Sequence, residues 1–172
     1  AQHPELTAEL PALSDALGKV GGPHHQRMGT LGGNLCLDTR CVYYNQTFFW
    51  REALGFCLKK DGDTCHVAGG KKCVAAASND SAPPLLVYGA TVDILGPTGG
   101  RNLAIHDFYK PDGIKNTRLE PGELVVSVRV PRPNQNLKAA FHKLRRRGAI
   151  DFPLLNMAVS VACDEQGKVT EL

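Results

Sequence analysis

Leucines near the N-terminus recur at the spacing of one helix face. Steps of four, three and four residues separate the members of this set, which are Leu6, Leu10, Leu13 and Leu17. Gly18 follows the last of them, and glycine commonly ends a helix. The pattern predicts a short helix over residues 11–17. A second short helix is predicted over 82–88, because a Pro-Pro pair begins this segment and a glycine follows it.

Later segments alternate hydrophobic and polar residues with the period of a half-buried strand. The predicted strands are 90–95, 101–105, 124–130, 139–144 and 155–163. A Gly- and Pro-rich turn at 96–100 makes the first two a hairpin, and the third needs a non-local partner. Strands and short helices together predict an α+β fold with a mixed sheet.

The Pro-rich segment 131–135 is the best candidate for a boundary between two units. We expect residues 1–133 to form one subdomain, interrupted by an insertion at 38–80, and 134–172 to begin a second α+β domain. A returning strand that starts at Lys168 has no room to finish, so the chain is expected to be truncated.

Composition narrows the class of protein. With 172 residues, 42% of them hydrophobic, the chain is long enough for one or two domains with a real core. A net charge of +3 is too small to argue for nucleic-acid binding. No apolar run approaches the ~20 residues of a membrane helix, and the first residues lack a signal-peptide pattern. A soluble, cytoplasmic protein with no membrane partner is expected.

Four of the six cysteines lie in the insertion at intervals of 16, 8 and 8 residues. They are Cys41, Cys57, Cys65 and Cys73. Some 40 residues with few strand signals need an organiser, and four thiols suit an iron-sulfur cluster or a tetrahedral zinc ion. Unliganded thiols and disulfides are the other possibilities. The remaining two, Cys36 and Cys163, are expected to pack as small hydrophobic residues.

Three sequence strings resemble the flavin-binding subunit of the molybdenum hydroxylase family, which includes xanthine dehydrogenase and carbon monoxide dehydrogenase. They are Thr-Leu-Gly-Gly-Asn at 30–34, Ser-Asn-Asp at 78–80 and Glu-Leu-Val-Val-Ser-Val-Arg-Val-Pro at 123–131. The four-cysteine insertion, which contains Arg-Cys-Val-Tyr-Tyr-Asn-Gln at 40–46, resembles the β subunit of the 4-hydroxybenzoyl-CoA reductase branch. In that branch the insertion carries a 4Fe-4S cluster, which implies that the four cysteines are its ligands.

The resemblance also implies an FAD site. Backbone amides of the glycine-rich string would face the FAD pyrophosphate, and its residues are Thr30, Leu31, Gly32, Gly33 and Asn34. Asp80 matches an aspartate at the flavin. Val125 or Val126 would lie by the ring system, and Lys143, or His142 one position earlier, would lie near it. No catalytic side chain is expected, because cofactors carry the chemistry.

By resemblance, this subunit relays electrons from ferredoxin through 4Fe-4S and FAD to 2Fe-2S centres and a molybdopterin site. Those last two lie on a small and a large partner subunit. Four lysines of the insertion are either a solvated face or a docking patch for ferredoxin; they are Lys59, Lys60, Lys71 and Lys72. The alternatives are a flavin subunit of a hydroxylase that oxidises an aromatic or heterocyclic substrate, and a non-enzymatic, zinc-stabilised interaction module.

Overall fold

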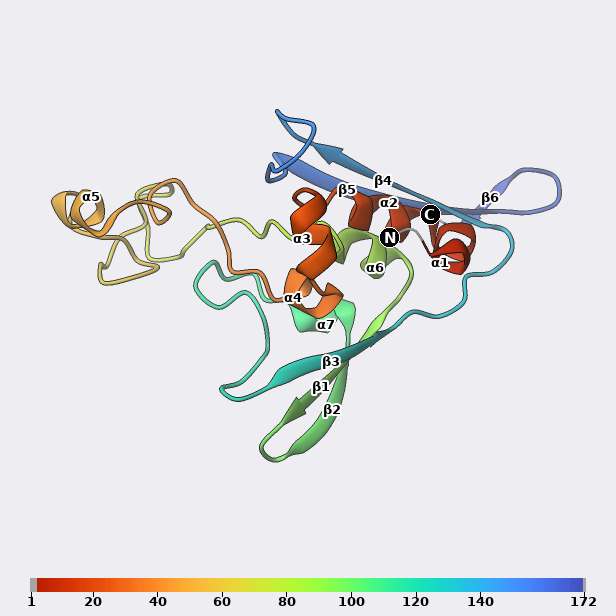
Figure 1. Cartoon of the computed structure of the whole chain (residues 1–172), viewed down its shortest axis with the longest axis horizontal. Helices are drawn as coiled ribbons and strands as arrows, with labels where there is room; N and C mark the ends of the chain where they lie inside the picture. Colours follow the sequence, from red (N-terminus) through yellow and green to blue (C-terminus); the bar gives the residue numbers. More distant parts are fainter. Residues whose placement is uncertain (1–2, 172) are drawn as a thin grey trace.

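Two three-stranded sheets enclose a layer of helices in the computed structural model, which describes residues 3–171 (Figure 1). The expected α+β class is confirmed. The sheets are not mixed as predicted, because the pairings within both of them are antiparallel. A long insertion leaves this body at one side. The layers meet in one hydrophobic core, to which both sheets and four of the helices in the described part of the chain contribute.

The helical layer is made of α1 (Pro4–Glu9), α2 (Pro11–Gly18) and α6 (Ala82–Val87). Both predicted helices are therefore confirmed, and α1 is an addition. Leu10 separates α1 from α2 with φ −128° and ψ 59°. This break has a local cause, since a residue that precedes proline is disfavoured in the helical conformation. Leu13 and Ala16 of α2 and Leu85 of α6 are buried.

The first sheet has the order β2-β1-β3. Its strands are β1 (Thr91–Gly96), β2 (Gly99–Ala104) and β3 (Leu124–Arg129). The predicted hairpin is confirmed, and the predicted non-local partner of β3 is β1. The chain leaves β2 earlier than expected, because Ile105 begins the short helix α7 (Ile105–Phe108), whose Ile105 and Phe108 are buried in the core.

The second sheet has the order β4-β5-β6, from β4 (Leu137–Leu144), β5 (Leu155–Cys163) and β6 (Val169–Glu171). Alternation along β4 turns Phe141 and Lys143 inward, where both are buried, and leaves His142 exposed. Phe141 belongs to the same core as the first sheet. The inward face of β4 therefore brings a charged side chain into the protein interior, next to the helical layer.

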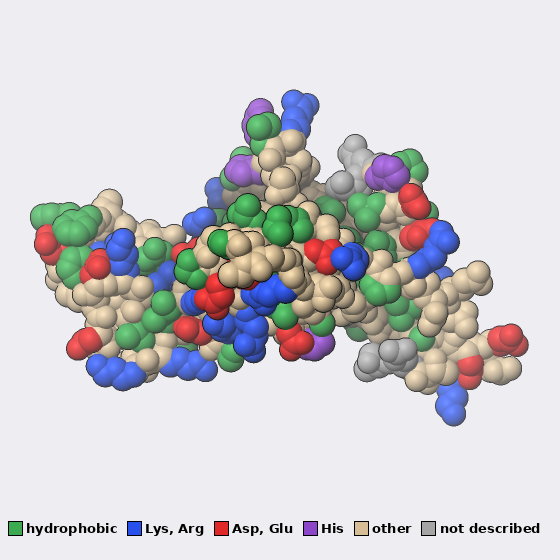
Figure 2. All heavy atoms as spheres, turned by 90° about the horizontal axis from the view of Figure 1, so that it is seen from below, with side chains coloured by type: hydrophobic (Ala, Val, Ile, Leu, Met, Phe, Trp, Pro, Cys, Tyr) green, Lys and Arg blue, Asp and Glu red, His purple; other side chains and the backbone are tan. Residues whose placement is uncertain are grey.

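Three further helices were not predicted: α3 (Pro23–Met28), α4 (Leu31–Leu35) and α5 (Phe48–Ala53). The last lies at the far end of the insertion (Figure 1). Hydrophobic side chains gather at this tip (Figure 2), among them Phe48 and Phe49, which are 62% and 79% exposed. No helix within residues 3–171 is long and apolar enough to cross a membrane.

The two cysteines outside the insertion differ from expectation. Cys36 follows the last residue of α4 and is exposed, and Cys163 at the end of β5 is half-buried. Neither is a buried core thiol. Cys36 misled the sequence analysis because its neighbour Leu35 is fully buried, whereas the helical turn at α4 directs the next side chain outward.

Glu123 ties the start of β3 to β2 and provides a test of the fold. Its carboxylate accepts two hydrogen bonds from Arg101 at 2.7 Å and one from the Glu120 amide at 2.7 Å. The Arg101 bonds first, and then the amide, lower the pKa of Glu123 from 4.5 to about 2. The pKa of Glu123 is lower in the folded protein than in the unfolded chain. The ionised carboxylate therefore stabilises the fold fully above pH 4.5, and this contribution to the free energy of unfolding is lost as the pH falls through about 2.

Glu123→Gln is therefore expected to lower the urea midpoint of unfolding at pH 7. The difference from the wild type should shrink between pH 4.5 and 2. Urea titrations at pH 7, 4 and 2.5 measure it. A difference that is the same at all three pH values would contradict a role for the carboxylate charge.

Candidate functional site

A cavity of about 770 Å³ lies between the end of α2, helices α3 and α4 and the loop at 150–152. Its lining residues come from segments 17–40, 78–80 and 150–152. This volume lies within the range of about 300–1,000 Å³ common for cofactor and small-molecule sites. The cavity is thus large enough for an extended ligand.

The glycine-rich string forms part of the cavity wall, and most of it is helical. Thr30 is the N-cap of α4, and its hydroxyl accepts a hydrogen bond from the Gly33 amide at 2.9 Å. That amide is therefore already engaged. The first amides of a helix have no intrahelical acceptor, so Leu31 and Gly32 are left as the donors of this turn.

The two adjacent glycines have different surroundings. A Cβ at Gly32 would meet the Val125 side chain at 3.3 Å, so Gly32 allows β3 to pack against α4. Val125 therefore lies behind α4 and does not line the cavity. A Cβ at Gly33 would meet only the Thr30 hydroxyl, at 3.0 Å, and Gly33 faces the cavity. Only the second glycine keeps the cavity open.

Asn34 and Asp80 line the same cavity from the core side. The Asn34 side-chain carbonyl accepts hydrogen bonds from the Ser81 amide at 3.1 Å and the Ser81 hydroxyl at 2.6 Å, which fixes α4 to the start of α6. Asn34 thus has a clear structural role. Five of the eight predicted flavin contacts line the cavity, and they are Thr30, Leu31, Gly33, Asn34 and Asp80.

Lys143 does not line the cavity but holds a residue that does. Its ammonium donates to the Asp80 carboxylate at 2.7 Å and to the Lys19 carbonyl at 3.0 Å. The Lys143 and Asp80 side chains are only 1% and 5% exposed. Asn156 donates to the other Asp80 oxygen at 2.9 Å. Sequence reasoning missed Asn156, although it is a polar residue between Leu155 and Met157 on an alternating strand.

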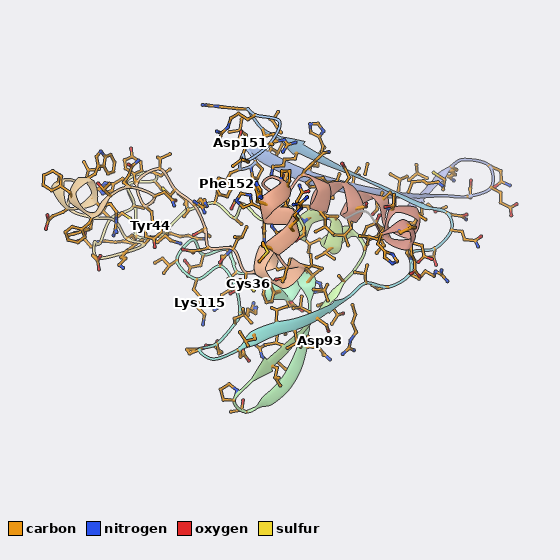
Figure 3. The ribbon with its side chains drawn as sticks, viewed as in Figure 1. Cys36, Tyr44, Asp93, Lys115, Asp151 and Phe152 are labelled. Atoms are coloured by element: carbon orange, nitrogen blue, oxygen red, sulfur yellow. The ribbon has the colours of Figure 1, made fainter. Side chains whose placement is uncertain are left out.

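Arg40 and Phe152 also line the cavity and were not predicted as site residues. The Arg40 guanidinium lies 4.0 Å from the centre of the Phe152 ring, which is a cation–π contact. Figure 3 shows Phe152 on the side of the helical layer that faces the insertion. Arg40 thus places a positive charge in the cavity wall, directly before the first cysteine of the insertion.

The four cysteines of the insertion line one small second cavity. Cys57, Cys65 and Cys73 are buried, and Cys41 is half-buried. Backbone N–H groups of Ala68, Val74 and Val67 lower the pKa of the Cys65 thiol. All six cysteines are free thiols. Within residues 3–171, no three His, Cys, Asp or Glu side chains form a group that could hold a metal ion.

Close packing joins this cysteine cavity to the body of the protein. A Cβ at Gly113 would lie 2.7 Å from the Cys73 sulfur and 2.6 Å from the Ala75 amide nitrogen, so no larger residue fits there. Arg40 and Ala76 exchange two backbone hydrogen bonds, of 2.8 and 2.9 Å, where the chain enters and leaves the insertion. The insertion is thus anchored at its base.

The proposed four-lysine patch needs a correction. Lys60, Lys71 and Lys72 are exposed, but the Lys59 side chain is only 5% exposed and lines the cysteine cavity. Its ammonium is bound by oxygen atoms of the protein instead of solvent. The sequence pattern failed here because neighbouring lysines look alike until their tertiary partners are known.

The larger cavity and its glycine-bearing wall define a domain that accommodates an extended ligand. Comparison with known proteins shows to which protein family this domain belongs. A model described as the FAD binding domain in molybdopterin dehydrogenase matches residues 1–133. The chain therefore belongs to this family of FAD-binding domains.

Individual relatives agree with this membership. The aldehyde oxidoreductase FAD-binding subunit PaoB of Escherichia coli is 31% identical over 98% of this chain and 56% of its own length. The nicotinate dehydrogenase FAD-subunit of Eubacterium barkeri is 25% identical over 98% and 45%. Reconstituted CO dehydrogenase from Oligotropha carboxidovorans aligns with a TM-score of 0.64 and 25% identity over 95% and 43%. The chain thus spans about half the length of these relatives, and its narrower likeness to 4-hydroxybenzoyl-CoA reductase stays a prediction.

Proposed function

We propose that this chain is the flavin subunit of a molybdenum-dependent oxidoreductase, with FAD in the larger cavity and a 4Fe-4S cluster in the cysteine cavity. One observation carries the proposal: Arg40 lines the first cavity and the adjacent residue, Cys41, lines the second. Two redox groups held on consecutive residues lie close enough to form one electron path.

The residues of the larger cavity fit FAD. Gly33 leaves its wall open, Arg40 supplies a positive charge suited to a pyrophosphate, and the first amides of α4 remain as donors. Asp80, held in place by Lys143 and Asn156, presents a fixed carboxylate. We propose that Lys143 acts through Asp80, and Val125 through Gly32, and that neither contacts the flavin.

The cysteine cavity offers the four thiols that a 4Fe-4S cluster takes as ligands. Structural zinc sites usually use paired Cys-x2-4-Cys ligands, and no two of these cysteines are that close in sequence. N–H groups directed at the Cys65 sulfur favour the thiolate that a cluster needs. The zinc-stabilised interaction module is therefore less well supported.

When bound, FAD exchanges electron pairs for single electrons and the cluster passes single electrons. The names of the relatives favour oxidation of a small substrate, such as an aldehyde or nicotinate. The family resemblance suggests that this reaction takes place at molybdenum on a large partner subunit, with 2Fe-2S centres on a small one. Electrons would then leave through this chain to a carrier such as ferredoxin, docked near the exposed Lys60, Lys71 and Lys72. The reverse direction, as in 4-hydroxybenzoyl-CoA reductase, is the second candidate and rests on the four-cysteine insertion.

Two further points belong to this proposal. A cytoplasmic location suits the six free thiols, because cysteines stay reduced there. We also propose that the FAD-binding unit ends near residue 133 and that 134–172 begin a second unit, whose β4 and β5 pack on the first.

Substitution of Gly33 tests the FAD site. Gly33→Leu places a side chain in the cavity, so flavin affinity is expected to fall about ten-fold or more, which corresponds to at least 1.4 kcal/mol. Gly18→Leu is the control, because its Cβ has open space and lies outside the cavity. The flavin content of the purified protein and an FAD titration of the flavin-free protein measure the effect. Equal flavin affinity in the two variants would place FAD elsewhere.

A further inference from the structure

Lys59 is a buried lysine in the wall of the cysteine cavity. Its side chain is 5% exposed, although lysine is among the residues that are almost never buried without a partner. Tyr44 lies beside it, with the Lys59 ammonium 4.9 Å from the centre of the ring. Figure 3 shows Tyr44 inside the insertion, toward the body of the protein.

Three residues from two segments of the chain hold the Lys59 ammonium. It donates to the Asp38 carboxylate at 2.7 Å and to the Gly113 carbonyl at 3.0 Å, and it also donates to the Thr39 hydroxyl. These bonds compensate the ammonium for its lost water and fix its position. The Lys59 ammonium therefore has one fixed position, unlike that of a solvent-exposed lysine.

The charge of Lys59 and that of its partner are screened unequally. The Asp38 side chain is 61% exposed, so water screens its carboxylate, whereas the ammonium at 5% exposure faces the protein interior. Asp38 is also absent from the lining of the cysteine cavity. Within this ion pair, the positive charge is therefore the one that acts more strongly inside the cavity.

We propose that Lys59 supplies a fixed positive charge that stabilises the reduced form of the cluster and so raises its reduction potential. This inference rests on the 4Fe-4S site proposed above. Reduction adds one electron, and hence one negative charge, to the cluster. A nearby positive charge in a region of low dielectric constant lowers the free energy of that more negative form.

The test is a redox titration of the purified complex, followed by EPR and visible absorbance, after iron and sulfide have been measured. Lys59→Gln keeps a hydrogen-bond donor but removes the charge. At a fixed applied potential, its ratio of reduced to oxidised cluster is expected to fall at least ten-fold, or about 59 mV for one electron. Lys59→Arg keeps the charge and should stay near the wild type. Lys71→Met is the control. The Lys71 side chain is 78% exposed, so the reduction potential of the cluster should not change in this variant.

Asp38→Asn separates charge from packing. It breaks the same ion pair but leaves the ammonium in place, so the potential is expected to stay level or rise. A fall in Asp38→Asn, or an unchanged potential in iron-loaded Lys59→Gln, would overturn the inference and leave the cluster itself established. If Lys59→Gln does not retain iron, the test rests on Lys59→Arg and Asp38→Asn. A lower reduction potential in either variant then overturns the inference. Wild-type complex without iron and sulfide would overturn both the inference and the proposed cluster.

Discussion

Replacing Lys143 by methionine is expected to lower the free energy of unfolding by about 3–5 kcal/mol, because it leaves a buried carboxylate without its counter-ion. The Asp80 side chain is 5% exposed, and Asn156 alone would remain to compensate its charge. Urea or thermal unfolding of the purified protein measures the loss. Flavin content should fall as well, since Asp80 lines the larger cavity.

A double variant tests whether the charge or the packing is responsible. Asp80→Asn combined with Lys143→Met removes both charges and should recover most of the stability that Lys143→Met alone loses. Lys71→Met provides the exposed comparison, since its ion pair with Asp63 spans 3.7 Å at the surface; its effect should stay within about 0.5 kcal/mol. Losses in Lys143→Met that match this control would mean that the ion pair contributes little.

Cys65→Ala is expected to abolish the cluster, with iron falling from about four to fewer than one per chain, because a 4Fe-4S cluster needs four thiolate ligands. The broad visible absorbance that bleaches on reduction should disappear with it. Flavin content should be unchanged, since Cys65 lies in the cysteine cavity and not in the larger one. Iron, acid-labile sulfide and zinc analysis of anaerobically purified protein measures the outcome.

Cys36→Ala is the matched comparison, because this cysteine is exposed and lies outside the cysteine cavity. It should keep full iron and sulfide. Iron retained in Cys65→Ala would exclude Cys65 as a ligand. Stoichiometric zinc without sulfide in the wild type would instead support the zinc-stabilised interaction module.

Alternating strands were the most predictable part of the fold. Thr91–Gly96 shows a period of two, because one of its faces packs on the core. In Leu124–Arg129 a register shift interrupts the period, so Val125 and Val128 pack on the core and Val126 is exposed. The short helices were not predictable. Helix Leu31–Leu35 has five residues, two of them glycine, so it offers too few positions to show a helical period. Its capping threonine and its contact with Val125 supply what the sequence pattern lacks.

The candidate site was predictable where residue type determines chemistry. Four clustered cysteines indicated a shared site, and they do line one cavity. Lys59 and Lys143 show the limit, since their burial depends on acceptors distant in sequence, such as Gly113 for Lys59 and Asp80 for Lys143. Spacing along the chain contains no information about such partners. Arg40 and Phe152 escaped notice for the same reason.

The paired backbone of Arg40 and Ala76 makes the insertion separable from the architecture around it. Because the chain departs and returns at one point, a hairpin of a few residues could close the gap without changing the register of either sheet. A lineage could therefore acquire or lose the whole insertion, together with the cluster proposed for it, in one event. The larger cavity would keep its other lining residues, and only Arg40, which also lies at the base of the insertion, would be affected.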